Sequence, residues 1–276
     1  MPSRVYQENC TLTPLRPPNA QKATTHSTLD LVSISARLGS AARLVALIAL
    51  SAAPLFAQSG AASAGFSERF LRSAKDTITV TVETQGRVIP FATALSSLQR
   101  VTRAGRSTIE LTYQWRGNDG SATADTLWID GRTLAPIENH RHNGLQEGET
   151  TFDGSSAHTR YTAKGKREQR VDTTVVGPLF ASGELDELIR SSPLALGYNG
   201  KYTLYYGPPG RLARQATFRV VRSETVAGRN GNSIECWVVD APLSEGLNTF
   251  FISKADRRII RLVNHEDPSA AFIFTR

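Results

Sequence analysis

The strongest constraint on the fold is a strict alternation of apolar and polar residues. In residues 78–83 isoleucine and valine alternate with threonine and glutamate, and in residues 108–115 Ile109, Leu111, Tyr113 and Trp115 take every second position. A period of two residues places such side chains on one face of a half-buried β-strand. Similar runs joined by short polar turns continue to residue 275. We therefore predict a mainly β fold, a curved antiparallel half-barrel of about eleven strands with one or two short helices packed on it.

One strand–turn–strand pattern occurs twice, in residues 125–142 and 248–265, and predicts two β-hairpins. At a constant offset of 123 positions the identical pairs are Thr126 and Thr249, Ile129 and Ile252, Ile137 and Ile260, and His142 and His265. We expect Gly131 to take a positive φ in the first turn, whereas residues 254–257 lack glycine and favour a type I turn. A repeated structural unit and the strand chemistry common to any two hairpins both explain the pattern.

Residues 1–57 have the composition of an over-long N-terminal extension with a signal peptide. Leu44 to Ala57 is an apolar run of signal-peptide length, preceded by Arg37 and Arg43 and too short to span a bilayer. We expect cleavage near Ala57 and a periplasmic or secreted protein without a transmembrane span. A linker and a short amphipathic helix follow in residues 58–75, where Phe66 and Phe70 have helical spacing, and a single curved-sheet domain in residues 76–276.

Charge and cysteine content exclude several classes of protein. The formal net charge of +7 is spread along the chain without an aromatic–basic platform, so no nucleic-acid partner is expected. Cys236 is the single cysteine after residue 57, which excludes an internal disulfide beyond that point. Because it alternates with Ile234 and Val238, we expect Cys236 to be buried.

Residues 183–192 predict a helix with an apolar stripe of Leu185, Leu188 and Ile189, ended by Pro193. If the sheet encloses a cavity, this stripe is its expected lid. The aromatic residues expected to line such a cavity are Trp115, Trp128, Tyr202, Phe218 and Phe250. An ordinary core packed under the two helices explains the same side chains slightly better.

The sequence gives little support for a catalytic site or a metal site. His140 and His142 share a strand face with Glu138, and possible third ligands are His158 and His265. A solvated strand end accounts for the same pattern. We therefore predict no metal site and no cofactor. No Gly-x-Ser-x-Gly motif occurs. Residues 145–172 carry little apolar alternation and predict solvated strands at an open side of the sheet.

The order of several packing motifs resembles a bacterial secreted family catalogued as domain of unknown function 3108, over roughly residues 75–276. The motifs are Asp172–Val175, the Gly177–Pro178 turn, Leu185–Ile189 ending in Leu194–Tyr198, Thr217–Val220, Cys236–Val239, Phe251–Ser253 and Arg258–Leu262. The resemblance implies a half-barrel similar to periplasmic lipoprotein carriers, in which a concave apolar face holds acyl chains. It implies no catalytic residues. The polar residues 145–172 depart from a fully apolar concave face.

These observations favour a non-enzymatic protein of the cell envelope that binds an apolar ligand, a lipid or the acyl chain of a lipoprotein, in the concave sheet. The alternatives are an envelope structural or interaction protein with a solid core, whose partner is another envelope protein, and, ranked last, a metal-dependent hydrolase. The identity of the ligand and the oligomeric state do not follow from the sequence.

Overall fold

The fold is one long sheet in which most strands pair with their neighbours in sequence. The computed structural model describes residues 66–207, 213–228, 230–243, 246–267 and 269–276, and the predicted signal segment lies outside them. The 15 strands pair in the order β8-β7-β6-β5-β4-β3-β2-β1-β15-β14-β13-β12-β11-β10-β9, antiparallel except for β9 and β10. They are β1 (Ala74–Thr84), β2 (Arg87–Arg103), β3 (Arg106–Gly117), β4 (Ala122–Asp130), β5 (Pro136–Asn143), β6 (Gln146–Asp153), β7 (Ser156–Ala163), β8 (Gln169–Thr174), β9 (Leu179–Ala181), β10 (Asn199–Tyr205), β11 (Ala213–Ala227), β12 (Ser233–Leu243), β13 (Gly246–Ser253), β14 (Ile259–Asp267) and β15 (Ala270–Thr275).

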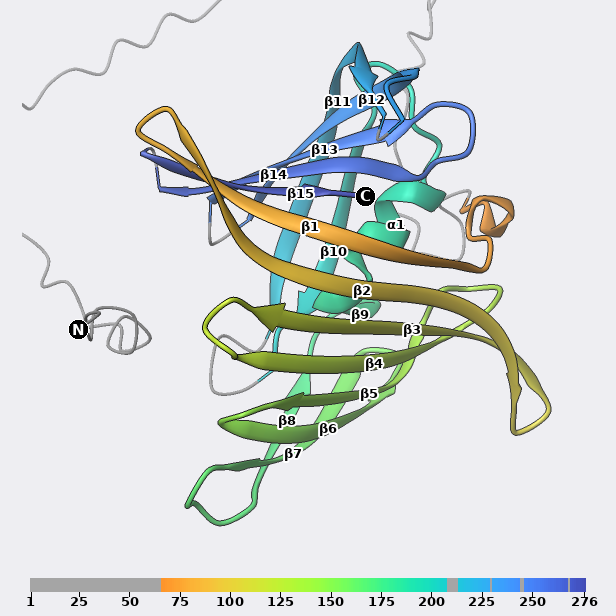
Figure 1. The fold of residues 1–276 in the computed structure, drawn as a ribbon. Helices are drawn as coiled ribbons and strands as arrows, with labels where there is room; N and C mark the ends of the chain where they lie inside the picture. Colours follow the sequence, from red (N-terminus) through yellow and green to blue (C-terminus); the bar gives the residue numbers. More distant parts are fainter. Residues whose placement is uncertain (1–65, 208–212, 229, 244–245, 268) are drawn as a thin grey trace, which may run out of the picture. The chain divides into compact units, whose positions relative to one another are not determined.

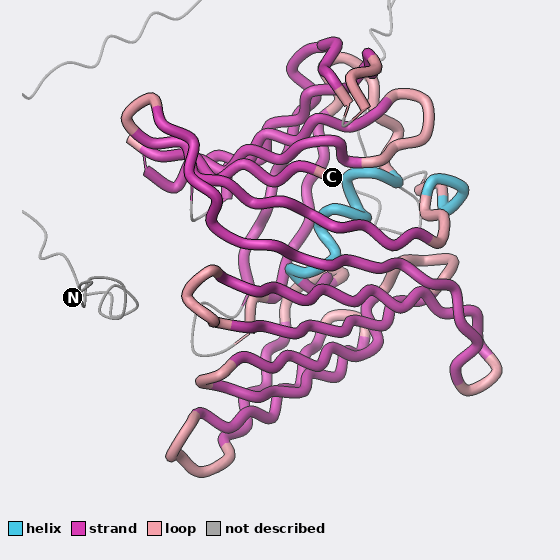
Figure 2. Tube along the Cα trace, viewed as in Figure 1, coloured by secondary structure: helices cyan, strands magenta, loops and turns pink. Residues whose placement is uncertain are grey.

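The described helical segments are short: η2 (Glu68–Phe70), η3 (Ser182–Glu184) and α1 (Leu185–Ser191). Figure 2 shows how little of the chain they occupy. The helix predicted over residues 183–192 is confirmed as η3 and α1, whereas the expected helix at residues 66–71 is a single 3-10 turn. With so few residues in that turn, helical spacing could not be distinguished from chance.

The predicted mainly β, curved antiparallel architecture is confirmed, but the estimate of about eleven strands was too low. Residues 91–101 form the middle of the long strand β2. The polar stretch 145–172 contributes β6, β7 and the start of β8, which lie at one edge of the sheet as expected. Strand β9 has only 3 residues, too few for an alternation to be recognised.

The sheet curls around α1, which lies on its concave side (Figure 1). Its two edges come into contact, because Tyr205 Oη on β10 lies 2.6 Å from Thr159 Oγ1 on β7 and the Leu179 N–H donates to the Gly154 carbonyl at 3.0 Å. Inside the curl the predicted stripe of α1 is buried, and Leu188 and Ile189 are fully enclosed. They belong to the main apolar core, together with Phe180, Phe218, Phe250, Leu71, Ile109 and Ile129.

Two buried polar side chains fix α1 in this position. The Glu184 carboxylate accepts a hydrogen bond from the Ala181 N–H at 2.6 Å, and burial raises the pKa of Glu184 well above its ordinary value. The Arg190 guanidinium donates through Nε to the Arg257 carbonyl at 2.8 Å and through Nη2 to the Phe70 carbonyl at 3.3 Å. These bonds connect the helix to the turn after β13 and to η2, so α1 is held at one end of the sheet.

The hairpin pattern at the offset of 123 positions is a repeated structural unit. In the first turn the Leu134 N–H donates to the Asp130 carbonyl, and in the second the Arg257 N–H donates to the Ser253 carbonyl, both at 3.0 Å. Leu134 and Arg257 have φ values of 58° and 61°. The expected positive φ at Gly131 is therefore wrong, and glycine is needed there because a Cβ would lie 2.7 Å from Ser107 Oγ and 3.0 Å from the Ser107 carbonyl oxygen.

Because neighbouring strands are antiparallel, successive turns lie alternately at two opposite ends of the sheet. Residues 85–86, 118–121, 144–145 and 164–168 turn at what we call the hairpin end, on the left in Figure 1. Residues 104–105, 131–135 and 154–155 turn at the opposite end, close to η2, which we call the helix end. The concave side thus has a helix end closed by α1 and a hairpin end without a described helix.

Candidate functional site

A cavity of about 300 Å³ lies between α1 and the concave face of strands β1 to β4, β14 and β15. We call it the α1 cavity. Its apolar lining comes from the inward positions of these strands and consists of Ile78, Leu98, Leu111, Leu127, Ile259, Leu262 and Phe274. A volume at the lower end of the range of small-ligand sites, with an apolar wall and polar or charged side chains beside it, suits an amphiphilic molecule.

The polar side of the α1 cavity is the face of α1 opposite to its leucine stripe. Asp186, Glu187 and Arg190 all line it. Glu187 and Arg190 form an ion pair at 3.6 Å with side chains only 10% and 8% exposed. Asp186 pairs at 3.1 Å with Arg276, which directly follows the last strand. Burial, with a further contribution from Asp186, raises the pKa of Glu187 to about 7 against the opposing effects of Arg190 and Arg276.

Tyr113 brings a hydroxyl to the same cavity from β3. Burial, and secondarily the negative charge of Asp186, raises its pKa to about 12, so the phenol keeps its proton at neutral pH. The cavity therefore combines an apolar floor with a protonated phenol and a buried carboxyl group whose pKa is raised.

Asp125 separates the α1 cavity from a smaller polar cavity next to it. Its carboxylate accepts hydrogen bonds from Arg141 Nε at 3.0 Å and Nη2 at 2.9 Å, and from the Asn139 amide. Asp125 lines the α1 cavity, Arg141 and Asn139 line the smaller one, and Ser182 and Gly183 line both.

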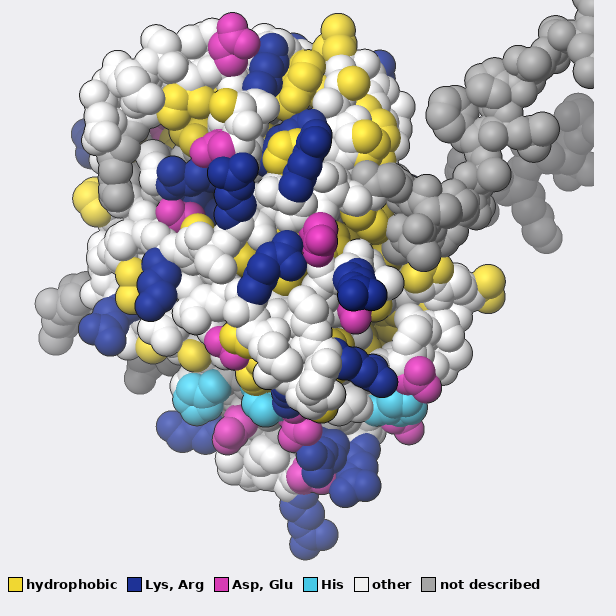
Figure 3. All heavy atoms as spheres, turned by 90° about the vertical axis from the view of Figure 1, so that its right-hand side faces the viewer, with side chains coloured by type: hydrophobic (Ala, Val, Ile, Leu, Met, Phe, Trp, Pro, Cys, Tyr) yellow, Lys and Arg dark blue, Asp and Glu magenta, His cyan; other side chains and the backbone are white. Residues whose placement is uncertain are grey.

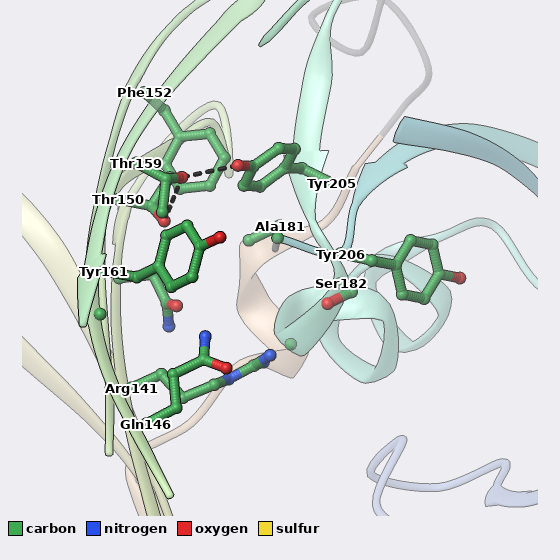
Figure 4. Close-up of a pocket in the computed structure, with 14 residues that line it drawn as sticks. Arg141, Gln146, Thr150, Phe152, Thr159, Tyr161, Ala181, Ser182, Tyr205 and Tyr206 are labelled. Carbon is green, nitrogen blue, oxygen red and sulfur yellow. Dashed lines mark hydrogen bonds between the residues drawn. The ribbon is translucent and has the colours of Figure 1, made fainter. Parts of the chain in front are cut away.

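The smaller cavity has a volume of about 30 Å³ and lies between β5 to β7 and the start of η3 (Figure 4). Thr159 Oγ1 lies within hydrogen-bond distance of both Thr150 Oγ1, at 2.8 Å, and Tyr205 Oη, at 2.6 Å. Tyr161 and Arg141 also line the cavity. This volume holds one or two water molecules. The departure from an apolar concave face expected for residues 145–172 is therefore present at this site.

Aromatic side chains continue the inner surface toward the hairpin end. Phe91 packs against Phe272, with ring centroids 5.2 Å apart, and against Trp115 at 5.8 Å. Trp115 in turn lies 6.4 Å from Phe274, which lines the α1 cavity. These four residues, which we call the aromatic cluster, are only partly buried. Partly exposed rings on the inner face provide an apolar surface from the hairpin end to the cavity.

The eight residues expected to bind a ligand do not lie together in the structure. Trp115 belongs to the aromatic cluster, whereas Trp128 lies on the convex face, where it donates to the Glu110 carboxylate at 2.9 Å and contacts His140. Leu185, Leu188, Ile189, Tyr202, Phe218 and Phe250 are buried in the main core. None of these eight lines the α1 cavity.

The residues that do line the cavity carry a signal in the sequence that our prediction did not use. Asp186 and Glu187 lie between Leu185 and Leu188, and Arg190 follows Ile189, so these three residues define the face opposite to the stripe. Such a face is ordinarily exposed to solvent, and here it meets the concave sheet.

His140, His142 and His158 lie on the convex face, and of these three only His140 belongs to a group of possible metal ligands among the described residues. One ligand atom each of Glu138, His140 and Glu149 lies within 4.8 Å of the others. However, the Arg103 guanidinium pairs with Glu138, and Arg160 pairs with Glu149 at 2.8 Å. Burial opposes ionisation of Glu138, but hydrogen bonds from His140 and Arg103 bring its pKa below the ordinary value. His158 pairs with Asp172 instead, at 2.8 Å.

Cys236 is fully buried beside Ile234 and Val238, as predicted from its alternation. Burial raises the pKa of its thiol to about 11, so it is a structural side chain. Within the described residues no helix has the length and apolar character needed to cross a bilayer.

Comparison with known proteins identifies the fold and a family. The model of the family described as protein of unknown function (DUF3108) matches residues 74–271. A solved structure is also similar, the beta-barrel-like protein of domain of unknown function DUF1849 from Brucella abortus. The match has a TM-score of 0.50 and 10% sequence identity and covers 74% of this chain and 95% of that chain, so it concerns the fold alone. No curated protein matches.

Proposed function

The chain belongs to the DUF3108 family, and from the geometry of its concave side we propose that it binds an apolar or amphiphilic ligand of the acyl-chain class in the α1 cavity. The observation that carries this proposal is the α1 cavity itself, about 300 Å³ between a sheet and a helix that are otherwise closely packed. A pocket of a few hundred Å³ with an apolar wall and a limited number of charged and hydroxyl groups is typical of a small-molecule binding site.

The lining supports an amphiphile better than a purely polar ligand. Leu98, Leu111 and Leu127 offer a carbon surface. Polar side chains lie beside it both on α1 and on the sheet, where Asp76, Tyr113 and Asp125 line the cavity. The aromatic cluster extends this apolar surface toward the hairpin end. An acyl chain would lie along the leucines and the aromatic rings, with a polar group hydrogen-bonded to Tyr113 or Glu187.

We propose a binding role rather than catalysis. The polar groups of the α1 cavity are engaged in ion pairs, Asp186 with Arg276 and Glu187 with Arg190. This arrangement suits the fixing of a helix and the orientation of a ligand. We also propose that residues 1–57 direct export and are removed near Ala57, because their composition is that of a signal segment. N-terminal sequencing of the protein from the periplasm tests export and the position of cleavage.

The binding proposal is tested by native mass spectrometry of the purified protein, organic extraction, and titration with a fluorescent fatty acid. Ser96 lines the α1 cavity and Thr93 lies exposed on the opposite face of the same strand. We expect Ser96→Phe to fill part of the cavity and weaken uptake at least about tenfold, a loss of about 1.4 kcal/mol. Thr93→Phe is the matched control and should bind like the wild type. Equal affinity in all three proteins would contradict the proposal.

A second candidate, an envelope scaffold with a solid core, is favoured by the dense packing around Phe180, Phe218 and Phe250. It predicts no co-purified lipid and no fatty-acid uptake by the wild type. In that case the search would move to protein partners.

A further inference from the structure

One edge of the long sheet is an open strand. β8 is the last strand on its side of the sheet, and no described strand pairs with its outer edge. Its 6 residues pair with β7 in a regular antiparallel register, without a bulge and without proline. None of the β8 residues lines the α1 cavity or the smaller cavity, so the proposed ligand gives this edge no role.

The hydrogen-bond pattern shows which backbone groups lie on this open edge. The Val175 N–H donates to the Ser155 carbonyl at 3.0 Å, where the β7–β8 ladder ends. Hydrogen-bonded and non-hydrogen-bonded pairs alternate in an antiparallel ladder, so every second residue back along β8 from Val175 bonds to β7. The residues between them, Arg170, Asp172 and Thr174, direct their N–H and C=O groups outward.

Side-chain distances support this assignment. Side chains approach more closely in non-hydrogen-bonded pairs, and Asp172 Oδ1 lies 2.8 Å from His158 Nδ1, while Thr174 Oγ1 lies 3.0 Å from Ser156 Oγ. Within the described part of the chain, the outward backbone groups of Arg170, Asp172 and Thr174 find no partner. β8 therefore offers a row of free donors and acceptors to a further strand.

The charges of β8 are poorly compensated within one chain. Figure 3 shows charged side chains of both signs, with histidines among them, over the lower part of the molecule, where β5 to β8 lie. Arg170 stands opposite Arg160 of β7, and like charges opposite each other are unfavourable. Arg160 pairs with Glu149 at 2.8 Å, whereas Arg170 reaches Glu168 only at 3.3 Å, with side chains 74% and 51% exposed. A carboxylate from a further strand would compensate Arg170 on its open side.

The charge pattern of β8 is self-complementary. Two antiparallel copies overlap most when the pair is centred on Val171 or on Asp172, because outward-directed residues must face one another. Centring on Asp172 sets two carboxylates face to face. Centring on Val171 sets Arg170 of each copy opposite Asp172 of the other, and opposite charges in this position stabilise a strand pair. The same register makes each Arg170–Asp172 pair a hydrogen-bonded pair, so the backbone and the side chains select one arrangement.

We propose that β8 pairs with β8 of a second copy of this chain, antiparallel and centred on Val171, so that the two sheets continue into one another. Charges on an edge strand commonly prevent pairing. Here they have opposite signs at the spacing that self-pairing requires. One short strand pair buries less area than a standard interface, so the dimer is weak and depends on concentration. The inference goes beyond ligand binding and does not rest on the α1 cavity.

The test is sedimentation velocity of the full chain from about 1 μM to about 1 mM, where we expect a monomer–dimer equilibrium. Arg170→Asp and Asp172→Arg each set like charges across the strand pair and should weaken the dimer at least about tenfold. A mixture of these two variants should form a heterodimer, because every charged pair across the strands again has opposite signs. A wild type that stays monomeric, or a mixture that fails to associate, would overturn the proposal.

Arg222→Asp is the matched control. Arg222 and Glu224 on β11 have the same spacing and the same opposite charges as the β8 pair, and they lie 2.9 Å apart. The ladder of β11 with β12 shifts register between Val220 and Arg222, and such an irregularity disfavours pairing with another chain. We expect Arg222→Asp to dimerise like the wild type. A loss equal to that of Arg170→Asp would show that β8 is not the interface.

Two further variants separate strand pairing from other effects. Asp172→Pro removes an outward N–H without touching the ladder to β7, a place where edge strands tolerate proline, and should abolish the dimer. A dimer that persists in this variant would mean that another surface associates. Ser96→Phe should dimerise like the wild type even where fatty-acid uptake is lost.

Unfolding in urea, on protein dilute enough to be monomeric, checks that the charge variants fold. Arg170 and Asp172 have side chains 74% and 76% exposed, so their reversal should leave the midpoint close to that of the wild type. A dimer lost in a variant with an unchanged midpoint is then lost at the interface.

Discussion

Leu134 and Arg257 stand 123 positions apart and adopt the same left-handed backbone conformation, with φ values of 58° and 61°. Each ends the same hydrogen-bonded turn after the second strand of a pair, β3–β4 in one case and β12–β13 in the other. A non-glycine residue in this region costs about 1 kcal/mol. The surroundings differ, because Leu134 is fully buried in the core whereas Arg257 packs beside the Phe70 ring at 4.8 Å.

Substitution by glycine should therefore destabilise the protein at position 134 but not at position 257. Leu134→Gly removes a buried side chain and should lower the free energy of unfolding by about 3 kcal/mol. Arg257→Gly relieves the same backbone strain and removes a guanidinium whose Nε and Nη1 find no hydrogen-bond acceptor among the described residues, so stability should not fall. Urea unfolding of both variants measures the difference. A large loss in Arg257→Gly would show that its packing on Phe70 outweighs the strain.

Glu187 should make stability depend on pH in the range between its two pKa values. Its pKa is about 7 in the folded protein and 4.5 in its ordinary state. Because the pKa of Glu187 is raised on folding, the free energy of unfolding is highest below about pH 4.5, where the carboxyl is protonated in both states. It should fall by up to about 3 kcal/mol as the pH rises toward 7. Glu187→Gln stays neutral, so the stability difference between variant and wild type should grow across this range and then level off. A difference independent of pH from 4 to 8, measured by thermal or urea unfolding, would contradict the burial of an ionisable carboxyl.

Asp125 should contribute more to the free energy of unfolding than an exposed carboxylate does. Asp125→Ala leaves Arg141 and Asn139 without their shared acceptor between the two cavities, which we expect to cost about 1–3 kcal/mol. Asp172→Ala is the control, because the Asp172–His158 pair is largely exposed and should contribute less than about 0.5 kcal/mol. Equal losses would show that Asp125 acts as an ordinary surface charge.

Gly200 should tolerate no side chain. A Cβ at this position would lie 2.1 Å from two ring atoms of the buried Phe218. We expect Gly200→Ala to destabilise the protein by about 1–3 kcal/mol, because Phe218 must move within a filled core. Gly144→Ala, which meets no atom within 4 Å, should be close to neutral. Circular dichroism melts compare the two, and an unchanged melting temperature for Gly200→Ala would contradict the packing at Phe218.

The Glu138–His140–Glu149 group should not hold stoichiometric zinc. A divalent cation at this group would lie close to the Arg103 and Arg160 guanidinium groups, which already neutralise the two carboxylates. Metal analysis of the purified wild type and of His140→Ala tests this expectation. Zinc present at one equivalent in the wild type and lost in the variant would instead support the hydrolase alternative.

Part of the candidate site follows from the sequence. The alternation in residues 108–115 correctly placed Ile109, Leu111, Tyr113 and Trp115 on one strand face, and that face is the concave one. The apolar stripe of residues 185–189 correctly defined the core-facing side of α1. The sequence did not show which aromatic strand residues point inward, and Trp115 and Trp128 illustrate why. Both fit an alternating strand, yet they lie on opposite faces of adjacent strands.

By itself, then, the sequence determined the class of fold, the helix and the division of each element into two faces, because these follow from local periods of two and 3.6 residues. It left open whether the two similar hairpins are a repeated unit, which the matching turns of the structure decided. The tertiary structure alone decided which faces enclose the cavity. The pairing of Thr112 with Thr126 sets Tyr113 opposite Asp125, and the curl of 15 strands brings α1 over them. Register and curvature arise from contacts between residues far apart in the chain, and no local pattern encodes them.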